Sequence, residues 1–258
     1  YDNYAPNAKK VLVNIDSDQI ENLNVRFDLI IHSDIRCFFE RLENFSIDVT
    51  KFDSLNQHQY KCDNWRKIES NGFIDSNEWN RRLTNRSPEK SCFVVDGGGT
   101  ALYAGFQSSI IKSINQRIIC LSGISSMGTG LAETIGAFKT NMFEKYFCII
   151  GDCSFFMNIQ DLQTIRSLNI PVIVSVINNN GQLAIRHTQK SFQESRFYGT
   201  HPEWGLSNPS IKMTTLAFGI RYKLIDDPTL LDEIIEEVME CQEPLVCEVI
   251  TSEDQTTL

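Results

Sequence analysis

The C-terminal part of the chain alternates short apolar runs with longer amphipathic stretches. Six apolar runs predict buried strands at residues 92–96, 117–121, 147–152, 172–178, 222–225 and 245–251. Helices are expected to begin near Thr100, Gly128, Met157, Leu183, Ser210 and Pro228. Each strand is apolar almost throughout, which is typical of a parallel sheet with both faces covered. The pattern predicts an α/β fold with a doubly wound, mostly parallel sheet and helices on both faces.

The N-terminal residues follow the same pattern on a smaller scale. Apolar runs predict strands at 11–16 and 29–31, and an amphipathic helix is expected over 35–42. These are about two β-α units, which are too few for a closed sheet. We therefore interpret residues 1–43 as part of a second α/β domain.

A polar segment separates the two patterned regions. It is rich in Asn, Ser, Asp and Lys, with Trp65 and Trp79 in expected helical pieces. We interpret residues 44–90 as a linker with helical segments that pack on a neighbour. This leaves residues 91–258 as the main domain.

Composition and charge limit the classes of partner that the protein is expected to bind. Hydrophobic residues make up 41% of the chain and charged residues 22%, which is typical of a folded globular protein. The formal net charge of -9 would repel nucleic acid and anionic membrane surfaces, so neither is expected as a partner. The eight cysteines form no CxxC pair and several lie in apolar runs, which predicts reduced core thiols and a cytoplasmic protein. The chain begins at Tyr1 rather than methionine, and we expect it to be part of a longer polypeptide.

Polar residues follow several predicted strands, where ligands of an open α/β sheet bind. Asp152 follows an apolar run and precedes an expected helix, so its carboxylate could cap that helix, meet an anion site or bind a metal. Asn179 ends the next strand, and Gly181 offers a carbonyl that can approach a ligand closely. One carboxylate, one amide and one carbonyl suit Mg²⁺, although residues 178–181 could also form a simple turn.

The run Gly97-Gly98-Gly99 follows the first strand of the main domain. Successive glycines let backbone N–H groups turn toward an anion. A dinucleotide fingerprint is excluded, because the GxGxxG spacing is not met and no acidic residue ends the strand at 117–121.

The segment from Gly151-Asp152-Cys153 to Asn178-Asn179 resembles the cofactor motif of thiamine diphosphate enzymes, which starts Gly-Asp-Gly and ends Asn-Asn. Residues 179–189 are most similar to acetolactate synthase and related proteins of surface-polysaccharide clusters. The resemblance implies that Asp152 and Asn179 bind Mg²⁺ through their side chains and Gly181 through its carbonyl. It also implies that a set of residues around the motif contacts the diphosphate, namely Gly151, Cys153, Ser154, Gln182 and Leu183. Cys153 departs from the usual glycine, and we do not expect it to act as a nucleophile.

A second family signature is matched by Ser125-Ser126-Met127-Gly128 and the residues that follow. The resemblance implies that the Ser125 carbonyl accepts a bond from the aminopyrimidine and that Met127 wedges between the cofactor rings. Without the resemblance, Met127 would be assigned to the core. Relatives contact the far end of the diphosphate at the positions of Gly98, Gly99 and Thr100.

The resemblance extends to residues 8–42, which are similar to the end of the family's central domain. It implies a 2-keto acid decarboxylase or carboligase with pyruvate as the donor, and a homodimer or homotetramer formed through the cofactor domains. The glutamate that activates the cofactor lies in a pyrimidine-binding domain without counterpart here, so we expect no catalytic residue in this chain and no activity of the chain alone. Glu133 is the acidic residue nearest in sequence to the ring-contacting segment, and we expect it to be solvated or structural.

Other functions remain open at this point. A simple 2-keto acid decarboxylase or a keto-sugar carboligase would use the same cofactor residues. A non-catalytic cofactor-binding or assembly module would keep the fold, and Cys153 lightly favours it. The chain offers no support for FAD, although the parent enzyme could bind it.

Overall fold

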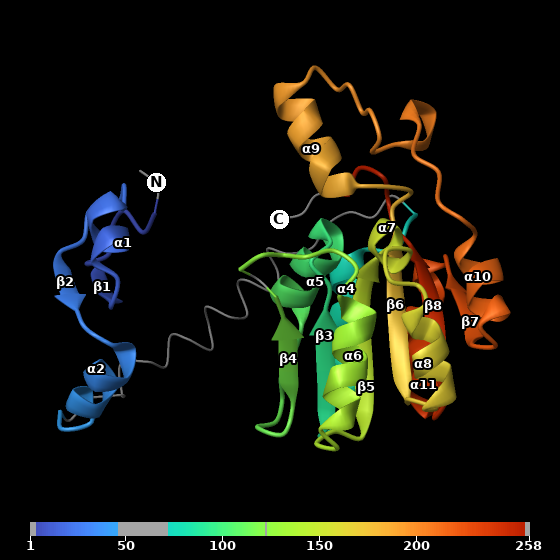
Figure 1. The fold of residues 1–258 in the computed structure, drawn as a ribbon, viewed down its shortest axis with the longest axis horizontal. Helices are drawn as coiled ribbons and strands as arrows, with labels where there is room; N and C mark the ends of the chain where they lie inside the picture. Colours follow the sequence, from blue (N-terminus) through green and yellow to red (C-terminus); the bar gives the residue numbers. More distant parts are fainter. Residues whose placement is uncertain (1–3, 46–71, 122, 256–258) are drawn as a thin grey trace. The chain divides into compact units, whose positions relative to one another are not determined.

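The computed structural model describes residues 4–45, 72–121 and 123–255, which belong to two compact units, 1–65 and 66–258 (Figure 1). Each unit is described by itself. The expected helical piece around Trp65 lies outside the described residues. Within the described part of the chain, no helix has the length and apolar character needed to cross a membrane.

The described part of the first unit, residues 4–45, contains a parallel strand pair and two helices. Strands β1 (Val11–Asn14) and β2 (Leu29–His32) pair in parallel, and α1 (Ser17–Asn22) and α2 (Ile35–Leu42) follow them in the chain. The first strand ends before its predicted limit because the Asp16 carboxylate caps α1.

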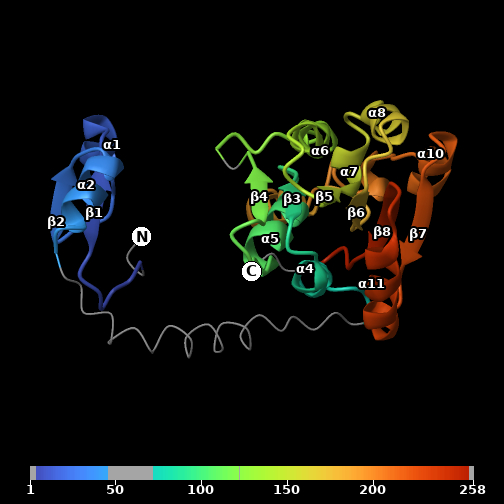
Figure 2. The same cartoon turned by 90° about the horizontal axis from the view of Figure 1, so that it is seen from below.

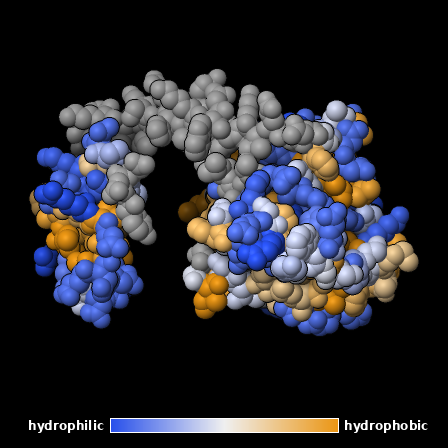
Figure 3. Space-filling model, turned by 90° about the horizontal axis from the view of Figure 1, so that it is seen from above, coloured by the Kyte–Doolittle hydropathy of each residue, from blue (hydrophilic) through white to orange (hydrophobic). Residues whose placement is uncertain are grey.

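The described part of the first unit has no buried residues. None of residues 4–45 is buried, and apolar side chains such as Ile30 and Phe39 are exposed. Figure 3 shows hydrophobic residues on the surface of this unit. Two strands without a buried face need further structure for stability.

The second unit contains the predicted parallel sheet. Its six strands run in the order β4-β3-β5-β6-β8-β7, and every pair is parallel. The strands begin and end within two residues of the predicted limits: β3 (Ser91–Val95), β4 (Arg117–Cys120), β5 (Lys145–Gly151), β6 (Val172–Asn178), β7 (Arg221–Ile225) and β8 (Leu245–Ile250). The predicted doubly wound α/β fold is confirmed.

Helices cover both faces of this sheet (Figure 2). One face packs against α4 (Ser76–Arg86), α5 (Gly99–Ser108) and α11 (Leu231–Glu240). The opposite face packs against α6 (Gly130–Lys139), α8 (Asp161–Ser167) and α10 (Ile211–Ala217). The remaining helical pieces are α7 (Asp152–Phe155), α9 (Leu183–Phe192), η2 (Pro202–Trp204) and η3 (Pro228–Leu230).

The strand order creates a switch point beside β3. The chain passes from β3 to β4 on one side and then crosses to β5 on the other. Loops that follow β3 and β5 therefore separate at the carboxyl ends of these strands, which is where open α/β sheets bind ligands.

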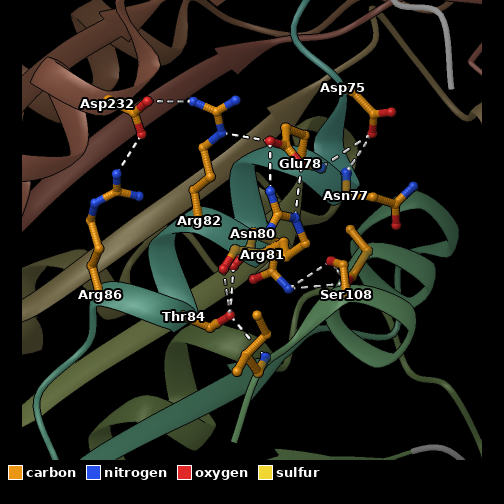
Figure 4. Close-up of polar contacts among 12 residues, drawn as sticks. Asp75, Asn77, Glu78, Asn80, Arg81, Arg82, Thr84, Arg86, Ser108 and Asp232 are labelled. Carbon is orange, nitrogen blue, oxygen red and sulfur yellow. Dashed lines mark hydrogen bonds and ion pairs between the residues drawn. The ribbon is translucent and has the colours of Figure 1, made fainter. Parts of the chain in front are cut away.

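Helix α4 belongs to the second unit. Its Trp79 and Leu83 are fully buried, and the Trp79 indole N–H donates to the Ser175 hydroxyl at 3.0 Å. On its outer side, Arg82 and Arg86 both contact the Asp232 carboxylate of α11 (Figure 4). The helix is therefore part of the domain rather than a free connection.

The prediction that a helix begins near Met157 was wrong. The chain forms the single turn α7 directly after β5, and α8 begins only at Asp161. Between them the Asn158 amide donates to the Gly128 carbonyl at 2.8 Å, which ties this segment to the loop before α6. Met157 itself is half exposed.

Candidate functional site

A cavity of about 270 Å³ lies at the carboxyl ends of β3, β5 and β6. Its lining comes from the four loops that the sequence singled out: Gly97, Gly98, Gly99, Thr100, Ser125, Met127, Gly151, Asp152, Cys153, Ser154, Asn179, Gly181, Gln182, Leu183, Ala184 and Ile185. The structure thus brings together every residue predicted to contact a cofactor. Gly97 belongs to the predicted glycine run, whereas Ala184 and Ile185, in the first turn of α9, were not predicted from the sequence.

Asp152 connects the two ends of the first motif. It is 3% exposed and is the first residue of α7, where Gly151 is the N-cap. Its Oδ2 accepts the Gly181 N–H at 2.7 Å, and its Oδ1 accepts the N–H of Cys153 at 2.7 Å. Burial raises the pKa of Asp152 to about 6, because the remaining hydrogen bonds only partly offset the loss of solvent. A divalent cation would favour the ionised form of this carboxylate.

Two buried oxygen atoms at the cavity have no partner among the described residues. The amide of Asn179 donates to the Thr100 hydroxyl at 3.0 Å, which leaves the Asn179 Oδ1 buried and without a hydrogen bond. The Ser154 hydroxyl is in the same state. An unpaired buried polar group costs about 1–3 kcal/mol. Such atoms at a cavity fit a site in which a metal and its ligand complete the contacts.

Backbone geometry at the cavity suits an anion. Helices α5 and α9 both begin at the lining, and neither has a side-chain cap at its N-terminus. The first N–H groups of a helix lack intrahelical partners and carry the positive end of its dipole. Two such helix starts can therefore hold phosphate oxygens.

The described side chains that line the cavity carry no positive charge. Of the described residues, those that line the cavity include no Lys, Arg or His. No group of three or more His, Cys, Asp or Glu is placed to hold a metal ion in the described chain. Mg²⁺ needs no such group, because it binds through one or two carboxylates together with phosphate oxygens and waters. The residues present therefore fit a magnesium diphosphate.

Close packing sets the shape of the glycine loop. A Cβ atom at Gly97 would lie 2.4 Å from the Ser125 carbonyl carbon, so only glycine allows these two loops to touch. The buried Asp96 carboxylate joins the same region, accepting the N–H groups of Gly98 at 2.9 Å and Gly130 at 3.1 Å. Asp96 thus connects the glycine run to the start of α6 through hydrogen bonds.

Ser125 and Met127, the two residues of the second signature, both line the cavity. Ser125 has a positive φ of 51°, a conformation that non-glycine residues rarely adopt. Met127 is half-buried, lines the cavity and belongs to neither core cluster. Its position permits contact with a bound ligand.

Cys153 is held as a thiol. It is 8% exposed, and the Asn208 amide donates to its sulfur at 3.3 Å. Burial and the Asp152 carboxylate raise the pKa of Cys153 to about 11. Since the thiolate is the reactive form, this pKa opposes a nucleophilic role at neutral pH.

Glu133 is not solvated, in contrast to one of the two expected roles. Both of its carboxylate oxygens are buried, and neither has a hydrogen-bond partner among the described residues. It lies in the first turn of α6 and does not line the cavity. Burial of both oxygens therefore excludes the solvated role.

Comparison with known proteins identifies the domain. Residues 96–249 match the model of the family described as thiamine pyrophosphate enzyme, C-terminal TPP binding domain. The acetolactate synthase large subunit of Cyanidium caldarium is 27% identical over 263 residues, which cover 98% of this chain and 44% of that protein. The acetolactate synthase isozyme 2 large subunit of Escherichia coli is 23% identical over 258 residues, 97% of this chain and 44% of that protein. The chain spans less than half the length of these relatives.

Proposed function

Because the chain belongs to the thiamine pyrophosphate enzymes through the C-terminal cofactor-binding domain at residues 96–249, we propose that its cavity binds thiamine diphosphate together with Mg²⁺. The observation that carries this proposal is the buried Asn179 Oδ1, which has no hydrogen-bond partner among the described residues and lies in the same cavity lining as the buried Asp152 carboxylate.

The metal would be held by Asp152 and Asn179 through their side chains and by Gly181 through its carbonyl. The diphosphate would lie against the starts of α5 and α9, contacting Gly98, Gly99 and Thr100 in one loop. The diphosphate would also contact residues of the loops that follow β5 and β6, namely Gly151, Cys153, Ser154, Gln182 and Leu183. The N–H of Cys153 donates to the Asp152 Oδ1, so the side chain at this usual glycine position leaves the backbone N–H directed at the proposed metal-binding carboxylate.

The two rings of thiamine diphosphate would be oriented by the loop that contains Ser125 and Met127. Met127 offers a large apolar side chain that presses on a ring without competing for protons. Ser125 would accept the aminopyrimidine bond through its carbonyl. These residues bind and bend the cofactor and take no part in proton transfer.

We propose that the whole protein is a 2-keto acid decarboxylase or carboligase of the acetolactate synthase type with pyruvate as donor, as the names of its relatives suggest. When bound, thiamine diphosphate supplies the electron sink for such reactions. Residues 1–43 would belong to the central domain, 44–90 to the connection and 91–258 to the cofactor domain, with α4 packed against it. The protein would be cytoplasmic and would assemble as a homo-oligomer through its cofactor domains.

Calorimetry on the 258-residue chain tests the cofactor proposal. We expect thiamine diphosphate to bind in the presence of Mg²⁺ and not in EDTA, because the cavity lining supplies no cationic side chain. Asp152→Ala should abolish binding and Asn179→Ala should weaken it. Asp161→Ala is the matched control, since Asp161 is also the first residue of a helix and lies outside the cavity. Binding that persists in EDTA or in the Asp152→Ala protein would contradict the proposal.

A further inference from the structure

Arg186 is a buried cation next to the cavity but outside its lining. It lies in α9 and is 5% exposed. Its Nη2 donates to the carbonyls of Asn179 at 2.9 Å and Glu253 at 3.0 Å. Its Nη1 donates to the carbonyls of Thr200 at 3.0 Å and Asn180 at 3.2 Å. One guanidinium thus joins three segments of backbone that are far apart in the sequence.

Glu253 joins the same segments from the other side. Its carboxylate accepts the Asn180 amide at 2.7 Å and contacts the His201 Nε2 at 3.2 Å. The residue follows β8, so its contacts link the end of that strand to the loop after β6. Arg186 and Glu253 therefore hold the loop at residues 179–181 from both sides.

The loop is packed closely around this guanidinium. Gly181 has a φ of 144°, and a Cβ atom there would lie 2.6 Å from the Arg186 Nη1 and 2.3 Å from the Thr200 carbonyl oxygen. A buried cation must be matched by acceptors to avoid a large desolvation cost. Four carbonyls fix both the guanidinium and the two peptide groups that precede Gly181. The direction of the Asn179 side chain and of the Gly181 carbonyl therefore depends on Arg186.

We propose that Arg186, supported by Glu253, is a positioning residue for the magnesium site. It acts through the backbone of Asn179 and Asn180 and contacts neither metal nor cofactor. This inference rests on the proposed function. Mg²⁺ demands near-ideal octahedral geometry, whereas Ca²⁺ accepts flexible coordination. Loosening the loop should therefore weaken binding with Mg²⁺ more than binding with Ca²⁺, which a general loss of stability would not do.

The experiment measures thiamine diphosphate binding to the 258-residue chain by calorimetry while Mg²⁺ or Ca²⁺ is varied. Arg186→Met keeps the apolar stem and removes the donors. We expect it to raise the Mg²⁺ concentration for half-maximal binding by about ten-fold or more, with a smaller rise for Ca²⁺. Arg186→Lys should give an intermediate value, because an ammonium cannot reproduce the fork that serves four carbonyls.

Controls separate this inference from the function on which it rests. Arg196→Met removes an exposed arginine whose ion pair with Glu194 is 3.7 Å long, and it should bind metal like the unmodified chain. Failure of the unmodified chain to bind the cofactor with Mg²⁺ would overturn the proposed function. If it binds and Asp152→Ala does not, unchanged Mg²⁺ dependence of Arg186→Met would overturn the positioning role alone. An equal loss for Mg²⁺ and Ca²⁺ would overturn it as well.

Glu253→Gln gives an independent measurement if Arg186→Met does not fold. Glu253 is partly exposed, so its substitution should leave the fold intact. The amide weakens the bonds to Asn180 and His201, and we expect a rise of about three-fold in the Mg²⁺ requirement, below the effect typical for such outer partners. An Mg²⁺ requirement equal to that of the unmodified chain would overturn the proposal.

Discussion

The Asp152 carboxylate accepts the backbone N–H of Gly181 at 2.7 Å, which joins residues that are 29 positions apart. The bond holds the loop after β5 against the loop after β6. Because the site is buried, the same carboxylate is costly to ionise without a metal. The stability of the metal-free protein should therefore depend on pH through Asp152.

Asp152→Asn tests this dependence in EDTA. The pKa of Asp152 is raised from 3.8 to about 6, so the folded chain binds this proton more tightly than the unfolded chain. The resulting stability is fully present below about pH 4 and is lost as the pH rises through about 6. Between these limits the unmodified chain should lose up to about 3 kcal/mol of unfolding free energy relative to Asp152→Asn. Urea unfolding at several pH values measures the difference, and parallel profiles would refute the prediction.

Met127→Ala should affect turnover of the full-length enzyme far more than its stability. Met127 lines the cavity outside both cores, so truncation should cost less than the roughly 2–5 kcal/mol typical of a core methionine. A misplaced cofactor should lower kcat by about 100-fold. Met239→Ala is the control, because Met239 packs against the core and should lose stability with normal turnover. The reverse result for Met127 would assign it to the core.

Glu133→Met should stabilise the protein. Both Glu133 carboxylate oxygens are buried, and neither has a hydrogen-bond partner among the described residues. An apolar side chain of similar length removes this unpaired group, and we expect a gain of about 1–3 kcal/mol in unfolding free energy. Glu236→Met, at an exposed position of α11, should change stability by less than about 0.5 kcal/mol. A loss of stability for Glu133→Met would mean that the carboxylate has a partner, such as a buried water.

Most of the fold was predictable because its signals are local. Apolar runs located all six strands of the main sheet within two residues, since both faces of a parallel sheet are buried. Helix α4 was assigned to a linker because its composition is polar. Its two anchors, Trp79 and Leu83, are four positions apart and share one helix face. That spacing indicates a packed helix, but not the sheet on which it packs.

The residues that line the site were also predictable from local signals, but Arg186 was not. Residues that follow strands meet at one edge of a parallel sheet, so the four loops could be placed together before their geometry was known. The contacts of Arg186 could not be predicted in this way, because its partners are backbone carbonyls from three segments. Backbone acceptors occur at every residue, so no spacing in the sequence indicates which of them a side chain contacts.

The last prediction is that the 258-residue chain, loaded with Mg²⁺ and thiamine diphosphate, does not decarboxylate pyruvate at a useful rate. Activation of the cofactor requires a carboxylic acid against its aminopyrimidine ring, and a positioned acid or base contributes about 10²–10⁴-fold. Of the described residues that line the cavity, Asp152 is the only carboxylic acid, and it is assigned to the metal. The buried Glu133 lies outside the lining. We therefore expect turnover at least about 100-fold below that of the full-length protein.

The measurement has to distinguish a chain that is inactive because it lacks the activating acid from one that is inactive because no cofactor is bound. Calorimetry on the same sample should first establish that the chain is saturated with thiamine diphosphate, because an empty site would also be inactive. Carbon dioxide release from pyruvate is then compared between the loaded chain, the full-length protein and the loaded chain mixed with a separately produced remainder of the protein. Recovery of activity in the mixture would support an acid supplied from outside this chain. Turnover by the loaded chain alone, at a rate near that of the full-length protein, would mean that the acid lies within residues 1–258 and that Asp152 or Glu133 has been assigned the wrong role.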